Sequence, residues 1–213
     1  MDIKEFETKI FHGLSQFFEA ESFAMLIDKK QFRKTTSIGF ANVIFILLDY
    51  ENDTWADVHI GIRNNQIEQI AQQFLNINLD DFQTDVNTLV ISIGKYHNNK
   101  YFRYKLTDDE ELHQICSSVK DFMLSEGFSF LHENQDLQHI DHLINATYHQ
   151  TNKYVYNQIH RCFKGLICAK LTANSRYTLI KESYKNYINQ NGSLPEQESF
   201  DRLINYLYYY NPN

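Results

Sequence analysis

Two neighbouring segments with opposite hydrophobic patterns constrain this fold more than any other feature. Residues 39–48 are apolar at almost every position, whereas residues 55–63 alternate between apolar and polar side chains. Successive side chains of a strand point to opposite faces of a sheet. The first strand therefore requires cover on both faces, and the second requires it on one face only. This pair predicts a sheet with a helical layer on one face and a partly covered polar groove on the other.

The alternating segment divides its side chains between the two faces. The apolar set consists of Ala56, Val58, Ile60 and Ile62, and the opposite set consists of Trp55, Asp57, His59 and Arg63. We expect the first set in the core and the second set in the groove. Residues 50–54, between the two segments, are polar and suit a hairpin turn.

Hydrophobic spacing predicts further strands and several helices around this pair. The additional strands are expected at residues 23–27, 31–36, 89–93 and 101–106. Capping residues indicate where the helices begin and end. They are Asp2 with Glu5 for a first helix, Asn64 or Asn65 for a short second one, and Thr107 with Glu110 for a third, which Gly127 ends.

From Ser129 onward the sequence has helical patterns and no strand pattern. The last helix opens with a capping box of Ser193 and Glu196 and with Pro195 in its first turn. We therefore predict an α+β protein, with a mainly antiparallel sheet of about five strands flanked by helices in residues 1–127. A C-terminal helical subdomain follows in residues 128–213. No Pro- or Ser-rich linker separates the two parts, so we expect one compact unit.

The composition of the 213 residues excludes several classes of partner. The formal charge of −7 disfavours nucleic acid and anionic membrane surfaces and suits a basic protein. Three cysteines form no C-x-x-C pair, and the N-terminal residues lack an apolar signal-peptide core. We expect a cytoplasmic bacterial protein. Seven glycines allow no Gly-rich phosphate loop, and we predict no cofactor.

The first candidate site is the polar face of the alternating strand. Asp57 and His59 lie two residues apart and therefore stand side by side, with Arg63 further along. A carboxylate beside an imidazole suits general acid–base catalysis, and the arginine could hold an anionic group. The alternative interpretation is that these side chains form polar contacts with a layer packed against the sheet.

A second candidate is the histidine group of residues 132–149, which consists of His132, His139, His142 and His149 with Asp136 among them. On a helix, Asp136, His139 and His142 recur every three residues, and such spacing can supply ligands to one metal ion. The alternative is that they are ordinary surface histidines. The pattern differs from the His-Glu-x-x-His helix of zinc hydrolases.

The third candidate is the tyrosine-rich C-terminal part, which ends in Tyr208, Tyr209 and Tyr210. Three consecutive tyrosines on a helix cannot all face one core, so at least one should be exposed. Exposed tyrosines suit a protein interface. The alternative is a frayed helix end whose rings pack along neighbouring helices.

Several short motifs resemble those of small bacterial α+β domains of unknown function, some of which occur among immunity proteins of polymorphic toxin systems. The motifs are Gln31-Phe32-Arg33-Lys34-Thr35, then Gly39-Phe40 with Asn42, then Trp55, Asp57-Val58 and Gly61-Ile62-Arg63. The resemblance covers residues 15–106. It implies a helix-strand-hairpin-helix-strand core and a binding role, and it assigns no functional residue.

The expected function is therefore that of a protein-binding factor, immunity-like or accessory, which acts through an acidic surface that bears tyrosines. One alternative is a hydrolase that uses Asp57 and His59, or a metal held by His139 and His142. Another is a structural adaptor. The sequence does not determine the oligomeric state.

Overall fold

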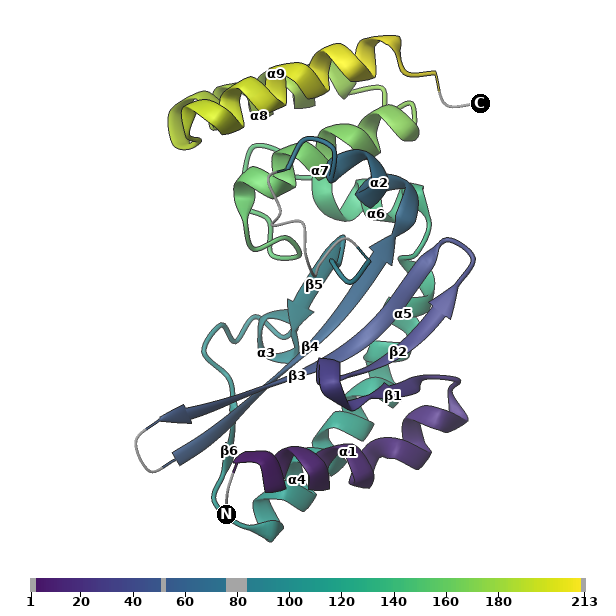
Figure 1. The fold of residues 1–213 in the computed structure, drawn as a ribbon, viewed down its shortest axis with the longest axis vertical. Helices are drawn as coiled ribbons and strands as arrows, with labels where there is room; N and C mark the ends of the chain where they lie inside the picture. The colour runs from purple at the N-terminus through teal and green to yellow at the C-terminus, as the bar shows by residue number, and fades with distance from the viewer. Residues whose placement is uncertain (1–2, 51–52, 76–83, 212–213) are drawn as a thin grey trace. The chain divides into compact units, whose positions relative to one another are not determined.

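The computed structural model describes residues 3–50, 53–75 and 84–211. It is an α+β protein with an antiparallel sheet, as predicted; the sheet has six strands where about five were expected. The described residues after 129 form helices and no strand. The strands, in the order β1-β2-β3-β4-β5 with β6 paired to β4, are β1 (Ala24–Leu26), β2 (Gln31–Thr36), β3 (Gly39–Tyr50), β4 (Asp53–Asn64), β5 (Leu89–Ser92) and β6 (Tyr104–Leu106). The apolar and the alternating segments are the two long central strands β3 and β4 (Figure 1).

The helices follow the predicted order, but the short helices α3 and α5 were not predicted, and two helix ends differ from the prediction. They are α1 (Ile3–Ala20), α2 (Asn65–Ala71), α3 (Ile93–Tyr96), α4 (Asp109–Phe122), α5 (Phe128–Glu133), α6 (Leu137–Asn145), α7 (Gln158–Leu171), α8 (Tyr177–Asn191) and α9 (Leu194–Tyr209). Asn64 caps α2, and the capping box of Ser193 and Glu196 opens α9, both as predicted. The predicted capping residue Asp2 lies outside the described residues.

The prediction that Gly127 ends a helix was wrong. Residues Met123–Gly127 form one turn of π-helix, and the chain continues directly into α5. A C′ glycine adopts a positive φ, which Gly127 does not. A Cβ atom at Gly127 would lie 2.6 Å from Sδ of Met123. The glycine is therefore used for close packing within a continuing helix.

The capping box predicted at Thr107 and Glu110 is displaced by one residue. Asp108 caps α4 by accepting a hydrogen bond from the Glu111 N–H at 3.0 Å. The Glu111 carboxylate accepts in turn from the Thr107 N–H and hydroxyl. Four acidic residues, 108–111, follow one another here, so the sequence allowed two registers for the same capping box.

The chain divides into two compact units that are interleaved in sequence. Unit 1 consists of residues 1–62 and 90–133, and unit 2 consists of residues 63–89 and 134–213. The sequence-based division at residue 127 lies six residues before residue 133, where the chain passes from unit 1 into unit 2 for the last time. The last two residues of β4, Arg63 and Asn64, belong to unit 2.

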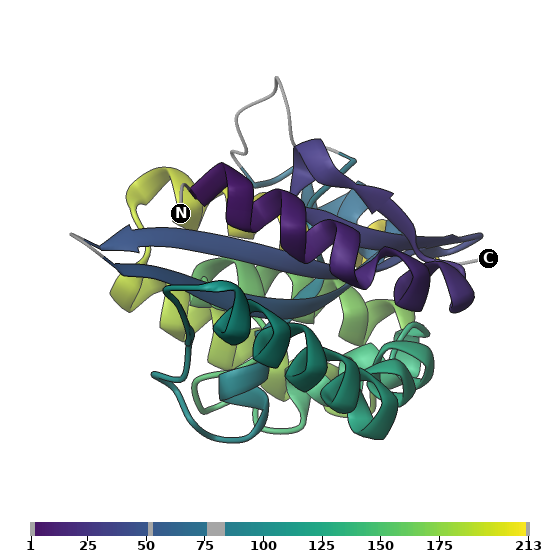
Figure 2. The same ribbon diagram turned by 90° about the horizontal axis from the view of Figure 1, so that it is seen from below.

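Unit 1 has an aromatic core between its helices and its strands. Phe18 of α1 stacks on Phe32 of β2 with 4.3 Å between ring centroids, and Phe11 lies 5.4 Å from Phe45 of β3. All four rings are at most 1% exposed. The apolar set of β4 is buried as predicted, and α1 packs against α4 on the same side of the strands (Figure 2). Apolar burial on this scale is the main stabilising contribution in unit 1.

Unit 2 is built around α7. Helices α2, α6, α8 and α9 all contact α7, as Figure 1 shows for the upper helices. Nine consecutive residues of α7, 161–169, are buried, including Arg161 and Lys164. A helix that is buried on every side must satisfy its charged side chains inside the unit. None of the described helices is long and apolar enough to span a membrane.

Candidate functional site

The structure brings Asp57 and His59 together, as their spacing predicted. The His59 Nε2 lies 3.1 Å from an Asp57 carboxylate oxygen, and the Arg103 Nε lies 3.9 Å from the same oxygen. His59 is buried and Asp57 is half-buried. Asp57 therefore orients the imidazole of His59 and also faces Arg103. This geometry fits a polar contact on the sheet face as well as an acid–base pair.

Arg63, the third residue of this candidate site, takes part in a network of unit 2. Its Nε donates to the Asn65 side chain at 2.9 Å, and its Nη1 donates to the Val86 carbonyl at 2.8 Å. These bonds join the end of β4 to the segment before β5. The guanidinium is only 6% exposed and has a structural role there.

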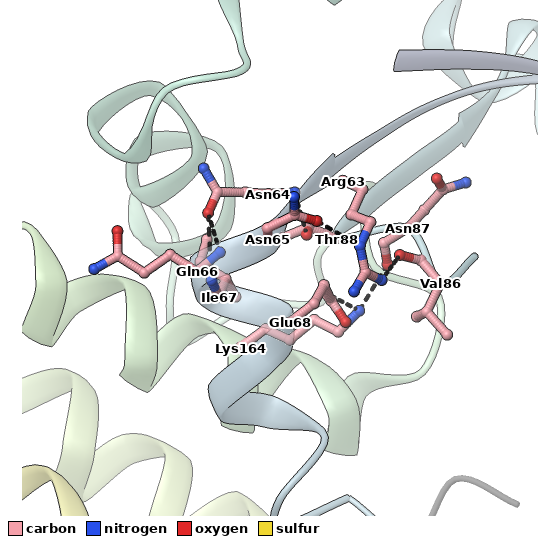
Figure 3. A network of polar contacts seen from close by, with 10 residues as sticks. All are labelled: Arg63, Asn64, Asn65, Gln66, Ile67, Glu68, Val86, Asn87, Thr88 and Lys164. Atoms are coloured by element: carbon pink, nitrogen blue, oxygen red, sulfur yellow. Dashed lines mark hydrogen bonds and ion pairs between the residues drawn. The ribbon is translucent and has the colours of Figure 1, made fainter. Parts of the chain in front are cut away.

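The same network contains a buried ion pair that the sequence pattern did not indicate (Figure 3). The Lys164 Nζ of α7 lies 2.9 Å from a Glu68 carboxylate oxygen of α2 and donates to the Asn87 carbonyl at 2.7 Å. Glu68 and Lys164 are 0% and 3% exposed. The pair joins α2, α7 and the segment before β5. It is closed to solvent, so we assign it to the architecture of unit 2.

The predicted metal candidates Asp136, His139 and His142 are only partly brought together. Asp136 caps α6, and its carboxylate lies 2.6 Å from the His139 Nδ1. Hydrogen bonds from His139 and Gln138 hold the pKa of Asp136 below its ordinary value, although burial acts in the opposite direction. Within residues 3–50, 53–75 and 84–211, no three His, Cys, Asp or Glu side chains are grouped as metal ligands. Asp136 and His139 thus form a helix cap.

At least one of the three consecutive C-terminal tyrosines was expected to be exposed, and this prediction is confirmed. Tyr208 and Tyr209 are 77% and 83% exposed, whereas Tyr206 packs on Phe74 with 5.4 Å between ring centroids. Tyr184 is buried and donates to the Asn145 side chain. Tyrosine-rich segments are therefore divided between the core and the surface of unit 2.

A groove of about 480 Å³ in unit 1 combines exposed aromatic rings with carboxylates. It lies between the α3–β6 segment and the C-terminal turn of α4 with the π-helix. The lining side chains are Ile93, His97, Asn99, Phe102, Tyr104, Ser118, Asp121, Phe122, Ser125 and Glu126, with Gly94 on its floor. None of these lining residues is a lysine or an arginine.

The turn after α3 gives the groove its aromatic wall. Residues 101–103, predicted to begin a strand, precede β6, which starts at Tyr104. Phe102 is therefore 39% exposed and meets Tyr104 edge to face at 4.8 Å between centroids. Burial raises the pKa of the Tyr104 hydroxyl above its ordinary value. The close approach of Gly94 to Phe102 and Asn99 leaves no room for a larger residue at position 94.

The π-helix supplies the acidic wall. The Ser125 hydroxyl of this turn donates to the carbonyl of Asp121 in α4 at 2.8 Å. Glu126 projects into the groove, where its carboxylate lies 3.6 Å from the His97 Nε2. π-Helical turns occur often at functional sites. The sequence did not reveal this turn, because its glycine, Gly127, matches the pattern of a helix end.

The negative charge of the chain is concentrated in the unit that carries this groove. Unit 1 has 17 Asp and Glu against 11 Lys and Arg, which gives −6, whereas unit 2 has 10 against 9, which gives −1. Ten of the 14 tyrosines are in unit 2. The acidic surface and the tyrosine-rich segments expected together are thus in different units.

The lining of the groove is therefore complementary to a group that is both cationic and apolar. Aromatic faces attract lysine and arginine side chains, and carboxylates pair with them. Comparison of the chain with models of protein families, with curated proteins and with solved structures gave no match. The geometry of the groove is therefore the basis for a functional assignment.

Proposed function

We propose that this chain is a protein-binding factor whose groove in unit 1 holds a basic, partly apolar segment of a partner protein. The observation that carries the proposal is the pairing of Phe102, Tyr104 and Phe122 with Asp121 and Glu126 in one groove without a lysine or arginine in its lining. An apolar side chain of the partner would pack on the rings. An adjacent Lys or Arg would meet the carboxylates.

The expected strength of this contact follows from its parts. A cation over an aromatic ring contributes about 0.5–2 kcal/mol, depending on its desolvation. Close charge pairs across an interface contribute about 1.5 kcal/mol or more. An incoming cation competes with His97 for Glu126, since the two lie 3.6 Å apart. Tyr101 and Leu124, which neighbour lining residues in sequence, are 84% and 66% exposed.

The partner class and the compartment belong to the same proposal. The net charge of −6 in unit 1 favours a basic partner through electrostatic steering. The resemblance of residues 15–106 to small bacterial domains of unknown function, some of which occur among immunity proteins, suits an immunity-like or accessory role in a bacterial cell. Cys116, Cys162 and Cys168 are buried free thiols, which suits the reducing cytoplasm.

The test is selection of binding peptides from a random displayed library with the purified protein, followed by affinity measurement with a synthetic peptide. We expect enrichment of peptides in which Lys or Arg neighbours an apolar or aromatic residue. The variant Asp121→Lys/Glu126→Lys should weaken binding at least about tenfold, equivalent to 1.4 kcal/mol. The matched control is Glu19→Lys, which reverses an exposed charge on α1 outside the groove.

Equal binding by all three proteins would contradict the proposal, because the groove carboxylates would then not hold the peptide. Weakening by Glu19→Lys as strong as that by the groove variant would contradict it too, because acidity alone and not the groove would then hold the peptide. Enrichment of acidic peptides, or of none, would contradict it as well. The same variants can then be compared in pull-downs from the host. A partner retained by Glu19→Lys and lost by the groove variant would identify the natural ligand.

A further inference from the structure

Unit 2 contains a cavity of about 280 Å³ with the opposite electrostatic character. It lies between α7, α8 and the segment that follows α6. Its lining includes Arg161 and His149, no aspartate or glutamate, and otherwise mostly neutral side chains that form hydrogen bonds. The size is just below the roughly 300–1,000 Å³ of pockets for drug-sized ligands. A small polar molecule would fill it.

Arg161 is the dominant charge at this cavity. The residue is 4% exposed, and its guanidinium donates to the carbonyls of Ile144 and Thr147 at 2.9 Å each and to the carbonyl of Gln150. These bonds cap the C-terminal end of α6 and hold the segment that follows. Every one of these acceptors is neutral.

No carboxylate of the described chain forms an ion pair with Arg161, and its Nε–H has no acceptor there. The buried acid in its neighbourhood is Asp141, which is reached through Asn145 and Tyr184. Asp141 already accepts hydrogen bonds from Asn145 at 2.7 Å and from Asn174. A buried positive charge without a counter-charge is unfavourable in a medium of low dielectric constant. An anion in the adjoining cavity would offset it.

One face of α8 supplies neutral hydrogen-bonding groups to the cavity. Ser183, Asn186 and Gln190 follow one another at helical spacing, and all three line it. Their side chains form no hydrogen bond with any other described residue. Arg176 lies outside the lining, 5.8 Å from the ring centroid of the lining residue Tyr148, and adds a second positive charge nearby. The surroundings are thus positive and rich in donors.

We propose that this cavity is a binding site for a small oxyanion, a carboxylate- or phosphate-bearing metabolite, held by the field of Arg161 and by the polar face of α8. The site lies within unit 2 and is independent of the groove proposed above for protein binding. The ligand would be bound mainly through charge and hydrogen bonds, and the rings of Tyr148, Tyr184 and Tyr187 in the lining would add apolar contact.

The test compares thermal unfolding and calorimetric titration with inorganic phosphate, glycerol 3-phosphate, acetate and succinate at constant ionic strength. Arg161 holds the end of α6, so its replacement could unfold the unit, and Ser183 is the better target. Ser183→Asp places a negative charge in the cavity, and Ser183→Asn is a neutral control of the same size. At ten times Kd we expect the melting temperature of wild type to rise by roughly 3–6 °C.

The expected pattern is retention of binding in Ser183→Asn and a loss of at least about tenfold in Ser183→Asp. Selective binding of the phosphates or of the carboxylates would identify the source of the oxyanion. Equal effects of the anion on both variants would overturn the proposal, since binding would then occur elsewhere on the surface. The proposal would also be overturned if none of the four probes bound at concentrations up to about 20 mM, roughly 20 times a metabolite level of about 1 mM.

Discussion

The interiors of the two units differ: that of unit 1 is rich in aromatic rings, whereas that of unit 2 also contains charged side chains. Unit 1 carries nearly all of the net charge of the chain, but its interior is a cluster of phenylalanines around the apolar side of the strands. Unit 2 is almost neutral in sum. It nevertheless contains all the charged residues that the described structure buries, namely Arg63, Glu68, Asp141, Arg161 and Lys164.

This difference predicts which kinds of substitution destabilise each unit. Apolar packing is non-directional, so an aromatic core loses stability in proportion to the volume and contact removed. A buried charge needs a particular partner at a particular place, and loss of that partner leaves an uncompensated charge. Unit 2 should therefore respond to single polar substitutions that would be harmless on unit 1.

The largest effect is expected from Lys164→Met. This change leaves the Glu68 carboxylate, 0% exposed, without its ion-pair partner at 2.9 Å. We expect a loss of about 3–5 kcal/mol in the free energy of unfolding of unit 2. Hydrogen exchange of peptides from α2 and α7 reports on unit 2, while the fluorescence of Trp55, the single tryptophan, reports on unit 1.

Two further variants make the result interpretable. Glu68→Leu/Lys164→Met should recover most of the lost stability, because both charges are then absent. Lys9→Met removes an exposed lysine that pairs with Glu5 and Asp109 on unit 1, and it should leave unfolding almost unchanged. If Lys164→Met alone were as stable as wild type, the contrast between the units would be wrong.

A smaller effect is expected from Phe18→Leu in the core of unit 1. The leucine keeps most of the apolar volume but loses the stacked contact with Phe32 at 4.3 Å. A decrease of about 1–2 kcal/mol in unfolding free energy should follow, observed by urea denaturation with Trp55 fluorescence. A loss as large as that of Lys164→Met would indicate that this core is as specific as the charged interior of unit 2.

The smallest effect concerns pH and His160 of α7. Burial lowers the pKa of His160 below its ordinary value of 6.5, and the positive charge of Lys164 adds to the shift while Glu196 opposes it. The unfolded chain therefore takes up this proton more readily than the folded chain. Unit 2 should lose stability as the pH falls through about 6.5, down to the lowered pKa.

His160→Gln should remove this part of the pH dependence. The two proteins should have matching pH profiles of stability above pH 7.5, where the histidine is neutral in both states, and should diverge on acidification. The measurement is a series of urea unfolding curves between pH 8 and pH 5. Parallel profiles throughout this range would show that His160 does not contribute.

Local patterns were sufficient for most of the fold. The alternation in residues 55–63 correctly placed Ala56, Val58, Ile60 and Ile62 in the core, and the capping residues of α2 and α9 were identified from their neighbours. These features depend on residues within one turn or one strand. For the same reason the pairing of Asp57 with His59 could be predicted.

Features that join distant parts of the chain could not be predicted in this way. Glu68 and Lys164 are 96 positions apart, and each looks like an ordinary surface charge on an amphipathic helix. One indication was available, because α7 is apolar on nearly all sides and its few charged residues therefore had to be buried. The groove depends on the π-turn at Gly127, whose glycine also matches the pattern of a helix end.

The interleaving of the two units has a consequence for synthesis on the ribosome. Within unit 2, residues 63–89 emerge first. The 44 residues 90–133 of unit 1 follow, and only then does the rest of unit 2, residues 134–213, emerge. At about 5–20 residues per second, these 44 residues take roughly 2–9 s to translate. During that interval the apolar face of α2 and the carboxylate of Glu68 exist without α7. Unit 2 can form only after residues 134–213 have followed, and a pause before then would prolong the exposure of its first segment to chaperones and proteases.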